Sequence, residues 1–306
     1  MKASVVISVY NCEDIIDKTI PKILEQNFPV EEFEIIIIND GSTDNSHRLL
    51  KNYDHHKNLK IINHKKNKGR CATRNSGIKQ AKGNIIIFLD CDIEVDKNFV
   101  LFHVSFHENE NIIGLLSNVV PNISKNKTKY NKFLSYKKRG AKLYGNQKSL
   151  PYKYFIFTAT SVKKFALEKT GLLNEELKGY GIDLHYSYRL YKNFPDNLFF
   201  ESSIKVKQYK LKSFSTALND FKDYGSNNLP IVLNLFPELH RDVGLSLFKN
   251  NTLTSKILRT LIFNKLNKFL CDFLIILLPS NLCNHFIKIR LLFELADGYK
   301  HKICDK

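Results

Sequence analysis

Apolar runs of strand length alternate with segments of helical periodicity over residues 4–89, and this alternation limits the possible folds more than any other feature. The expected strands are residues 4–9, 33–38, 59–62 and 84–89, and the expected helices are residues 13–26, 42–53 and 70–81. Strands that are apolar on both faces and alternate with helices are typical of a mostly parallel sheet with helices on each side. In such sheets ligands bind beyond the carboxyl ends of the strands. Polar clusters at residues 10–11, 39–44 and 90–92 follow three of the expected strands.

The alternation fades past residue 212, where helical patterns dominate. Amphipathic helices are expected at 257–278 and 284–295, with Pro279 between them, and a basic helix or ordered loop is expected at 125–142. We therefore predict an α/β domain at residues 1–212 and a helical extension at residues 213–306. No apolar run is long enough to span a bilayer, and the first residues do not resemble a signal peptide.

The chain is strongly basic, with 47 Lys and Arg against 30 Asp and Glu, a formal net charge of +17. Residues 111–167 contain no acidic residue. Such a balance favours nucleic acid, anionic lipid or phosphorylated substrates as partners, or it reflects a lysine-rich composition without a functional meaning. The six cysteines form no CxxC pair, so reduced thiols in a cytosolic protein are expected.

Two carboxylates stand at the end of the fourth expected strand. Asp90 and Asp92 are one residue apart, and this arrangement can share a hard divalent cation that also bridges a diphosphate. The alternative is a pair of acidic residues in an ordinary turn.

Three further polar segments lie at the same predicted edge. Asp40 ends the second strand and can accept hydrogen bonds from a base or ribose, while Ser42 or Thr43 can cap the next helix. Tyr10 follows the first strand and can stack on a base, and Arg74 can reach a phosphate. Each of these residues also has a purely structural interpretation.

Taken in order, these segments resemble the family 2 glycosyltransferases, which have the GT-A fold. The matching pieces are SVVISVYN, IIIINDGSTDNS, NKGRCATRNSGIKQAKGN and FLDCD, which span residues 3–96 almost without a break. The resemblance implies that FLDCD carries a DxD motif in which Asp92 binds Mn²⁺ or Mg²⁺ with Asp90 nearby. It also implies a nucleotide-sugar donor, a UDP-sugar by expectation, held by Ser8, Tyr10, Asp40, Arg74 and Asp90.

Residues 158–190 resemble the acceptor region of the same family, and Asp183 matches the catalytic base of its inverting members. A carboxylate at a helix start can take the proton of an attacking hydroxyl, and helix capping is the alternative. Two residues depart from the family pattern: Ile182 replaces a Glu and His185 replaces a second acid. Gln208 stands where many relatives have a His, and its carbonyl oxygen is a candidate metal ligand.

The expected function is therefore an inverting hexosyl- or N-acetylhexosaminyltransferase of surface polysaccharide or lipopolysaccharide synthesis, acting on a glycan or lipid-linked acceptor. Alternatives are a sugar nucleotidyltransferase, or a basic nucleic-acid or membrane-binding protein with a degenerate transferase fold. A nucleic-acid partner is not expected. A cytoplasmic location is expected, with the C-terminal helices lying on the anionic inner face of a membrane, packing on the transferase domain or forming a homo-oligomer.

Overall fold

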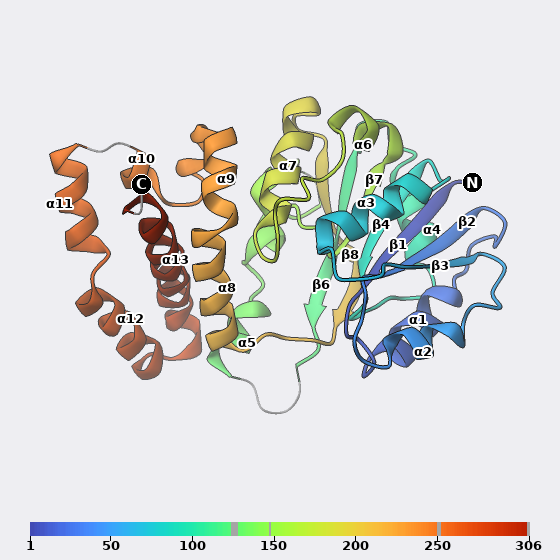
Figure 1. Cartoon of the computed structure of the whole chain (residues 1–306), viewed down its shortest axis with the longest axis horizontal. Coiled ribbons are helices and arrows are strands. Elements are labelled where there is room, and N and C mark those ends of the chain that lie inside the picture. Colours follow the sequence, from blue (N-terminus) through green and yellow to red (C-terminus); the bar gives the residue numbers. More distant parts are fainter. Residues whose placement is uncertain (124–127, 147, 250–251, 305–306) are drawn as a thin grey trace. The chain divides into compact units, whose positions relative to one another are not determined.

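The computed structural model describes residues 1–123, 128–146, 148–249 and 252–304 and divides the chain into two compact units (Figure 1). The first unit contains Met1–Asn122, Lys137–Glu176 and Asp183–Leu211, and the second contains Ile123–Tyr136, Leu177–Ile182 and Lys212–Lys306. Two internal segments thus belong with the C-terminal residues. Whether residues 1–212 and 213–306 behave as separate domains stays a prediction.

The first unit is built on an eight-stranded sheet with the strand order β3-β2-β1-β4-β7-β6-β8-β5. The strands are β1 (Ala3–Val9), β2 (Phe33–Asn39), β3 (Leu59–Asn63), β4 (Ile85–Asp90), β5 (Ile93–Glu94), β6 (Gly114–Pro121), β7 (Ala159–Lys163) and β8 (Leu198–Gln208). The four strands expected from the sequence are β1 to β4, and they pair in parallel. Beyond β4 the sheet is mixed, because β7 pairs antiparallel with both β4 and β6.

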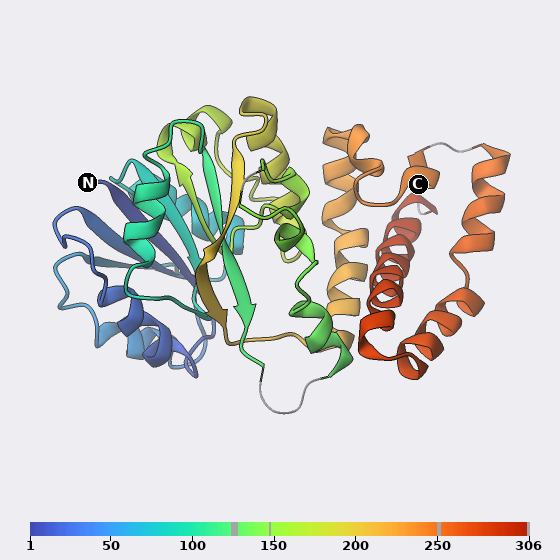
Figure 2. The ribbon, with the colours of Figure 1, turned by 180° about the vertical axis from the view of Figure 1, so that it is seen from behind.

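Alternate residues of the parallel strands face opposite layers of helices. Val5, Ile7 and Val9 belong to the main core with α1 (Ile16–Leu24) and α4 (Phe99–Phe106), whereas Val6 faces α3 (Arg70–Gln80). Figure 1 shows α3 in front of the sheet, and Figure 2 shows α4 in front from the opposite side. A side chain on Gly77 would meet Val6 Cγ1 at 2.2 Å, so α3 approaches the sheet as closely as a glycine allows.

Three further helices and two 3-10 turns complete the described part of the first unit. They are α2 (Ser46–Lys51), α6 (Lys164–Thr170) and α7 (Ile182–Asn193, whose first residue belongs to the second unit), with 3-10 turns η1 (Gly140–Leu143) and η2 (Tyr152–Tyr154). The expected helices at 13–26 and 42–53 are therefore shorter than predicted. The helix expected at 70–81 is confirmed to within one residue.

The second unit is helical. Its elements are α5 (Lys129–Leu134), α8 (Phe214–Ser226), α9 (Asn228–Leu235), η3 (Pro237–His240), α10 (Ser246–Lys249), α11 (Leu253–Ile262), α12 (Lys265–Leu277) and α13 (Ser280–Cys304). α8 and α13 run side by side (Figures 1 and 2), and a side chain on Gly298 would meet the Lys222 carbonyl oxygen at 2.0 Å. Small residues thus allow these two helices to pack in close contact.

The amphipathic segment expected at 257–278 is two helices rather than one. α11 ends at Ile262, and the side chain of Asn264 accepts a hydrogen bond from the Asn267 backbone N–H, which caps the start of α12. Of the expected basic segment 125–142, residues 125–127 lie outside the described residues, and the rest contains α5 and the start of η1, with residues 135–139 between them in turns. Among the helices described, none is both long and apolar enough to cross a bilayer.

Candidate active site

The carboxyl ends of β1, β2 and β4 meet at one edge of the sheet. In the parallel register Ser8 pairs with Asp90, and Val9 pairs with Asn39. Tyr10, Asp40 and Asp90 therefore lie at neighbouring strand ends, as the sequence predicts. Ser8 is half-buried within β1, and Tyr10 is 46% exposed, so its aromatic side chain is accessible to a ligand.

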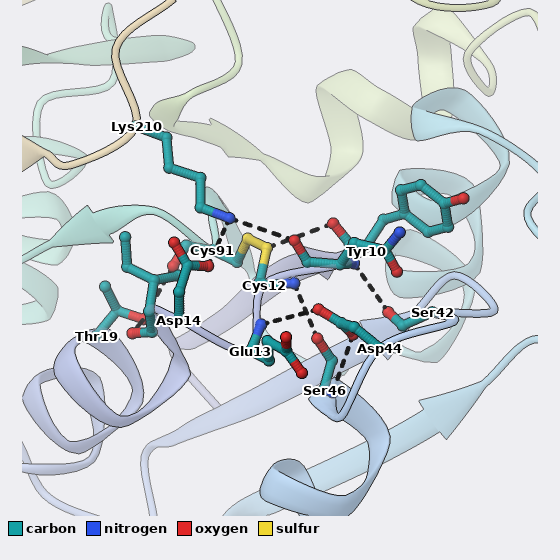
Figure 3. A network of polar contacts seen from close by, with 12 residues as sticks. Tyr10, Cys12, Glu13, Asp14, Thr19, Ser42, Asp44, Ser46, Cys91 and Lys210 are labelled. Atoms are coloured by element: carbon teal, nitrogen blue, oxygen red, sulfur yellow. Dashed lines mark hydrogen bonds and ion pairs between the residues drawn. A yellow bond between two sulfur atoms is a disulfide. The ribbon is translucent and has the colours of Figure 1, made fainter.

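The turn after β1 is joined to the turn after β2 by a polar network (Figure 3). The Asn11 backbone N–H donates to Ser42 Oγ at 3.1 Å, and the Cys12 N–H donates to Ser46 Oγ at 2.8 Å. Asn11 adopts a positive φ of 50°, and its carboxamide oxygen accepts from the Thr43 N–H at 2.9 Å. The expectation that Ser42 or Thr43 caps the next helix is wrong, because α2 begins only at Ser46.

The turn after β4 is tied to the same network. Cys91, between Asp90 and Asp92, forms a disulfide with Cys12, and its carbonyl oxygen accepts from the Thr19 hydroxyl at 2.9 Å (Figure 3). The prediction that all six cysteines are reduced is therefore wrong for this pair. Lys210 also reaches the turn after β1, where its ammonium lies 2.7 Å from Asp14 Oδ1.

Asp40 is buried and heavily hydrogen-bonded. Its carboxylate accepts from the backbone N–H groups of Lys68 at 2.9 Å and Gly69 at 2.8 Å, and it lies 2.7 Å from His64 Nδ1. A carboxylate has about four acceptor positions, so these contacts occupy most of them. Asp40 thereby fixes the loop that leads into α3. This role of His64 and of the loop was not apparent in the sequence, because the partners are distant along the chain.

Arg74 joins two of the predicted site residues. Its guanidinium, only 2% exposed, donates to Asp183 Oδ1 at 3.0 Å, to Asp90 Oδ1 at 3.4 Å and to the Phe157 carbonyl oxygen at 2.8 Å. Burial alone would lower the pKa of Arg74, but the negative charges of Asp183 and Asp90 outweigh it and raise the pKa. The sequence suggested a phosphate for Arg74, whereas the structure gives it two carboxylates.

Asp183 lies in the first turn of α7 and is 26% exposed in its side chain, so it is held by Arg74 yet open to a ligand. Ile182 and His185, the two departures from the family pattern, are buried. Burial and the charge of Arg189 lower the pKa of His185 to about 4, which leaves that imidazole neutral near pH 7. Asp183 is thus the one acidic group that this motif offers.

Asp92 is the candidate metal ligand. Burial, together with the negative charge of Asp90, raises the pKa of Asp92 to about 6. The Gln208 side-chain amide donates to Asp92 Oδ2 at 3.3 Å. Asp90 pairs with Arg74, whereas the side-chain partner of Asp92 is the neutral Gln208 amide. Two carboxylates with hard oxygen donors in this arrangement fit a divalent cation. Within the described residues no group of three or more His, Cys, Asp or Glu side chains could hold a metal.

Known proteins share sequence and fold with this chain. The model of the family described as glycosyl transferase family 2 matches residues 4–171, more than half of the chain. A poly(ribitol-phosphate) beta-glucosyltransferase of Bacillus spizizenii is 39% identical over 118 residues, which are 38% of this chain and 19% of that protein. The chain therefore spans about a fifth of the length of this curated relative.

Two solved structures share the fold over the whole chain. Staphylococcus aureus TarS 1–349 in complex with UDP-GlcNAc has a TM-score of 0.58 and 18% identity, covering 100% of this chain and 93% of that one. The mannosyltransferase PcManGT from Pyrobaculum calidifontis, in complex with GDP-Man and Mn²⁺, has a TM-score of 0.66 and 12% identity, covering 100% and 88%. The sheet, its site edge and the family match lead to one assignment: this chain belongs to glycosyl transferase family 2 and has the GT-A fold.

Proposed function

We propose that this chain transfers a sugar from a UDP-sugar to a hydroxyl group of a glycan or lipid-linked acceptor, with inversion at the anomeric carbon. The observation that carries the proposal is the position of Arg74, which contacts Asp90 on the donor side and Asp183 on the acceptor side. A single buried cation thus links the residue expected at the donor to the residue expected to act as base.

The donor side of the proposal uses the edge formed by β1, β2 and β4. The exposed ring of Tyr10 stacks on the base, and Ser8, Asp40 and Asp90 contribute polar groups to the nucleoside. Asp40 also anchors the loop before α3, so it supports the base site even where its own acceptor positions are taken. The TarS complex with UDP-GlcNAc, which shares the fold, supports a uridine nucleotide.

The metal in this proposal is Mn²⁺ or Mg²⁺, held by Asp92 with Asp90 nearby and with the Gln208 carbonyl oxygen as a candidate third donor. When bound, such a cation neutralises the negative charge of a leaving diphosphate. Gln208 donates its amide N–H to Asp92 in the present arrangement, so its carbonyl oxygen would have to turn toward the cation. The Mn²⁺ complex of PcManGT supports this choice of metal.

The acceptor step is assigned to Asp183. Its carboxylate takes the proton of the attacking hydroxyl while the acceptor oxygen bonds to the anomeric carbon and the bond from that carbon to the diphosphate breaks. Arg74 holds the carboxylate through one N–H bond and leaves the other oxygen for the acceptor. Attack opposite the leaving group inverts the anomeric centre.

The acceptor class follows from charge and from the relatives. A net charge of +17 favours a phosphorylated acceptor, and the Bacillus relative is named for poly(ribitol-phosphate). We therefore propose a cell-surface polymer or its lipid-linked precursor.

A screen of nucleotide sugars tests the proposal. UDP-glucose, UDP-GlcNAc and GDP-mannose are incubated with the protein and Mn²⁺, and release of the nucleoside diphosphate is measured with and without polyribitol phosphate. The proposal expects release from a UDP-sugar that requires the metal and that the polymer stimulates. Asp54→Asn, which changes an exposed carboxylate outside the proposed site, is the matched control and should keep full activity.

The remaining alternatives give different results in the same assay. A sugar nucleotidyltransferase would release no nucleoside diphosphate from these donors, and would instead release pyrophosphate when given a nucleoside triphosphate and a sugar 1-phosphate; this class is disfavoured by the family assignment. A degenerate binding protein would release nothing from any donor. Either result would overturn the proposed activity.

A further inference from the structure

The helices α11 and α12 expose a large apolar surface in the second unit. Its members are side chains between 38% and 77% exposed: Leu253, Ile257, Leu258, Leu261, Ile262, Leu266, Phe269, Leu270, Phe273, Ile276 and Leu277. We name these eleven residues the α11–α12 apolar surface. Single exposed apolar residues are ordinary, but a run of this size along consecutive helices marks a surface that binds something.

The exposed residues lie on one side of each helix. On α12, the apolar residues Leu266, Phe269, Phe273 and Ile276 recur every three or four positions. The buried Cys271 and Ile275 fall on the opposite side of the same helix, because successive residues turn by about 100°. α12 therefore already has a buried side for packing within its unit, and its second apolar side is additional.

Positive charge accompanies this surface. Between Asp242 and Asp272 the chain has no acidic residue and has five basic ones, among them the exposed Lys256 and Lys265. Another lysine strengthens the helix itself: the Lys129 ammonium donates to the carbonyl oxygens of Ile275 at 3.0 Å and Leu278 at 2.7 Å, at the end of α12. Apolar side chains flanked by lysines are the composition of helices that lie in a membrane interface.

We propose that the α11–α12 apolar surface is a docking site for an anionic lipid bilayer, with its apolar side chains entering the boundary between headgroups and acyl chains and Lys256 and Lys265 facing the headgroups. A second protein chain fits less well, because the acid-free segment would bring like charges together across a symmetric contact. This proposal does not depend on the proposed transfer reaction. It would locate the protein at the membrane surface, where lipid-linked molecules are found.

Co-sedimentation of the full chain with vesicles tests the proposal. We expect the protein to pellet with phosphatidylcholine vesicles that contain phosphatidylglycerol, less with phosphatidylcholine alone, and less at high salt. The triple variant Leu266→Ser, Phe269→Ser, Ile276→Ser should lower the partition coefficient by about tenfold or more. Its three positions are exposed, so the fold should be kept, which circular dichroism checks.

Matched controls distinguish binding through this surface from nonspecific binding through exposed apolar residues or lysines elsewhere. The triple variant Val30→Ser, Leu143→Ser, Leu235→Ser removes apolar side chains elsewhere that are 50–57% exposed, and it should bind as the wild type does. Neutralising Lys256 and Lys265 to Gln should weaken binding by about fivefold for each lysine, whereas the same change at the exposed Lys57 and Lys79 should have a small effect.

Three results would overturn the proposal. One is wild-type protein that stays in the supernatant with every vesicle composition. Another is equal pelleting of the wild type and the α12 triple variant. The third is a dimer, detected by analytical ultracentrifugation without lipid, that the α12 variant dissociates while no vesicle is bound. Nucleotide release from the donor should be unaffected by these variants, so failure here leaves the proposed reaction standing.

Discussion

Replacing Asp183 with Asn removes one negative charge and keeps a side chain of the same shape. The carboxamide oxygen can still accept a hydrogen bond from Arg74. In the wild type this bond is 3.0 Å long and both partners are charged. The pair is partly exposed at Asp183, and Arg74 keeps its contacts with Asp90 and the Phe157 carbonyl. Weakening one such bond costs about 1 kcal/mol of folding stability, less than the roughly 1.5–3 kcal/mol that a complete bond to a charged group contributes.

The effect on catalysis should be far larger than the effect on stability. Asn cannot accept the acceptor proton, so kcat should fall by roughly 10²–10⁴-fold, the usual contribution of a positioned general base. The affinity for UDP should stay within about twofold, since Asp90 and Tyr10 remain in place. The assay combines single-turnover transfer, UDP titration and thermal unfolding of the wild type, Asp183→Asn and the control Asp54→Asn.

The reasoning is refuted if UDP affinity falls in step with kcat, because Asp183 would then act on the donor side through Arg74. It is equally refuted if transfer proceeds at the wild-type rate. A large loss of stability with normal specific activity would mean that Asp183 serves mainly as the partner of the buried guanidinium.

Further predictions concern the metal, the core and pH. Asp92→Asn should abolish metal-dependent nucleotide release while the protein stays folded; full activity in saturating Mn²⁺ would contradict the metal assignment. Burial lowers the pKa of His103 to about 3 and that of His107, with a further contribution from nearby positive charge, to about 4. Both histidines are neutral in the folded protein, whereas in the unfolded chain they take up protons below about pH 6.5. Their contribution to the free energy of unfolding is therefore fully present above that pH. It declines as the pH falls toward 4, by about 1.4 kcal/mol per pH unit for each histidine. Urea unfolding at several pH values checks this. A free energy of unfolding that does not change between about pH 5 and pH 7 would exclude it. Gly77→Ala should lower the free energy of unfolding by about 1–3 kcal/mol because its methyl group meets Val6, and an unchanged denaturation midpoint would show that α3 can move away.

The parallel half of the sheet could be predicted because its strands carry the pattern themselves. The residues of β1, β2 and β4 are apolar on both faces, which only a strand between two layers of helices requires. β7 lacks this pattern, because it contains Thr160 and Ser161. Its position beside β4 follows from tertiary pairing. No local signal in the sequence indicates that antiparallel neighbour.

The positions of the site residues could be predicted, but most of their partners could not. Asp40, Asp90 and Asp183 are recognisable from strand ends and motif spacing. Arg74 was expected to meet a phosphate, since nothing local reveals that Asp183, 109 positions away, accepts its hydrogen bond. The link between Cys12 and Cys91 was missed for the same reason, because the two residues are 79 positions apart and belong to no spacing motif.

The change of strand direction at β4 has a consequence for how such a site can diversify. β4 is parallel to β1 on one side and antiparallel to β7 on the other, so Asp90 stands on a seam between two differently ordered halves of the sheet. Asp40 belongs to one half, whereas Asp183 follows β7 on the other. Insertions and substitutions after β7 leave the register of β1, β2 and β4 untouched. A chain of this design can change its acceptor while keeping its donor. Hybrid proteins that join the β1–β4 half of one chain to the β7 half of a relative are a way to test this.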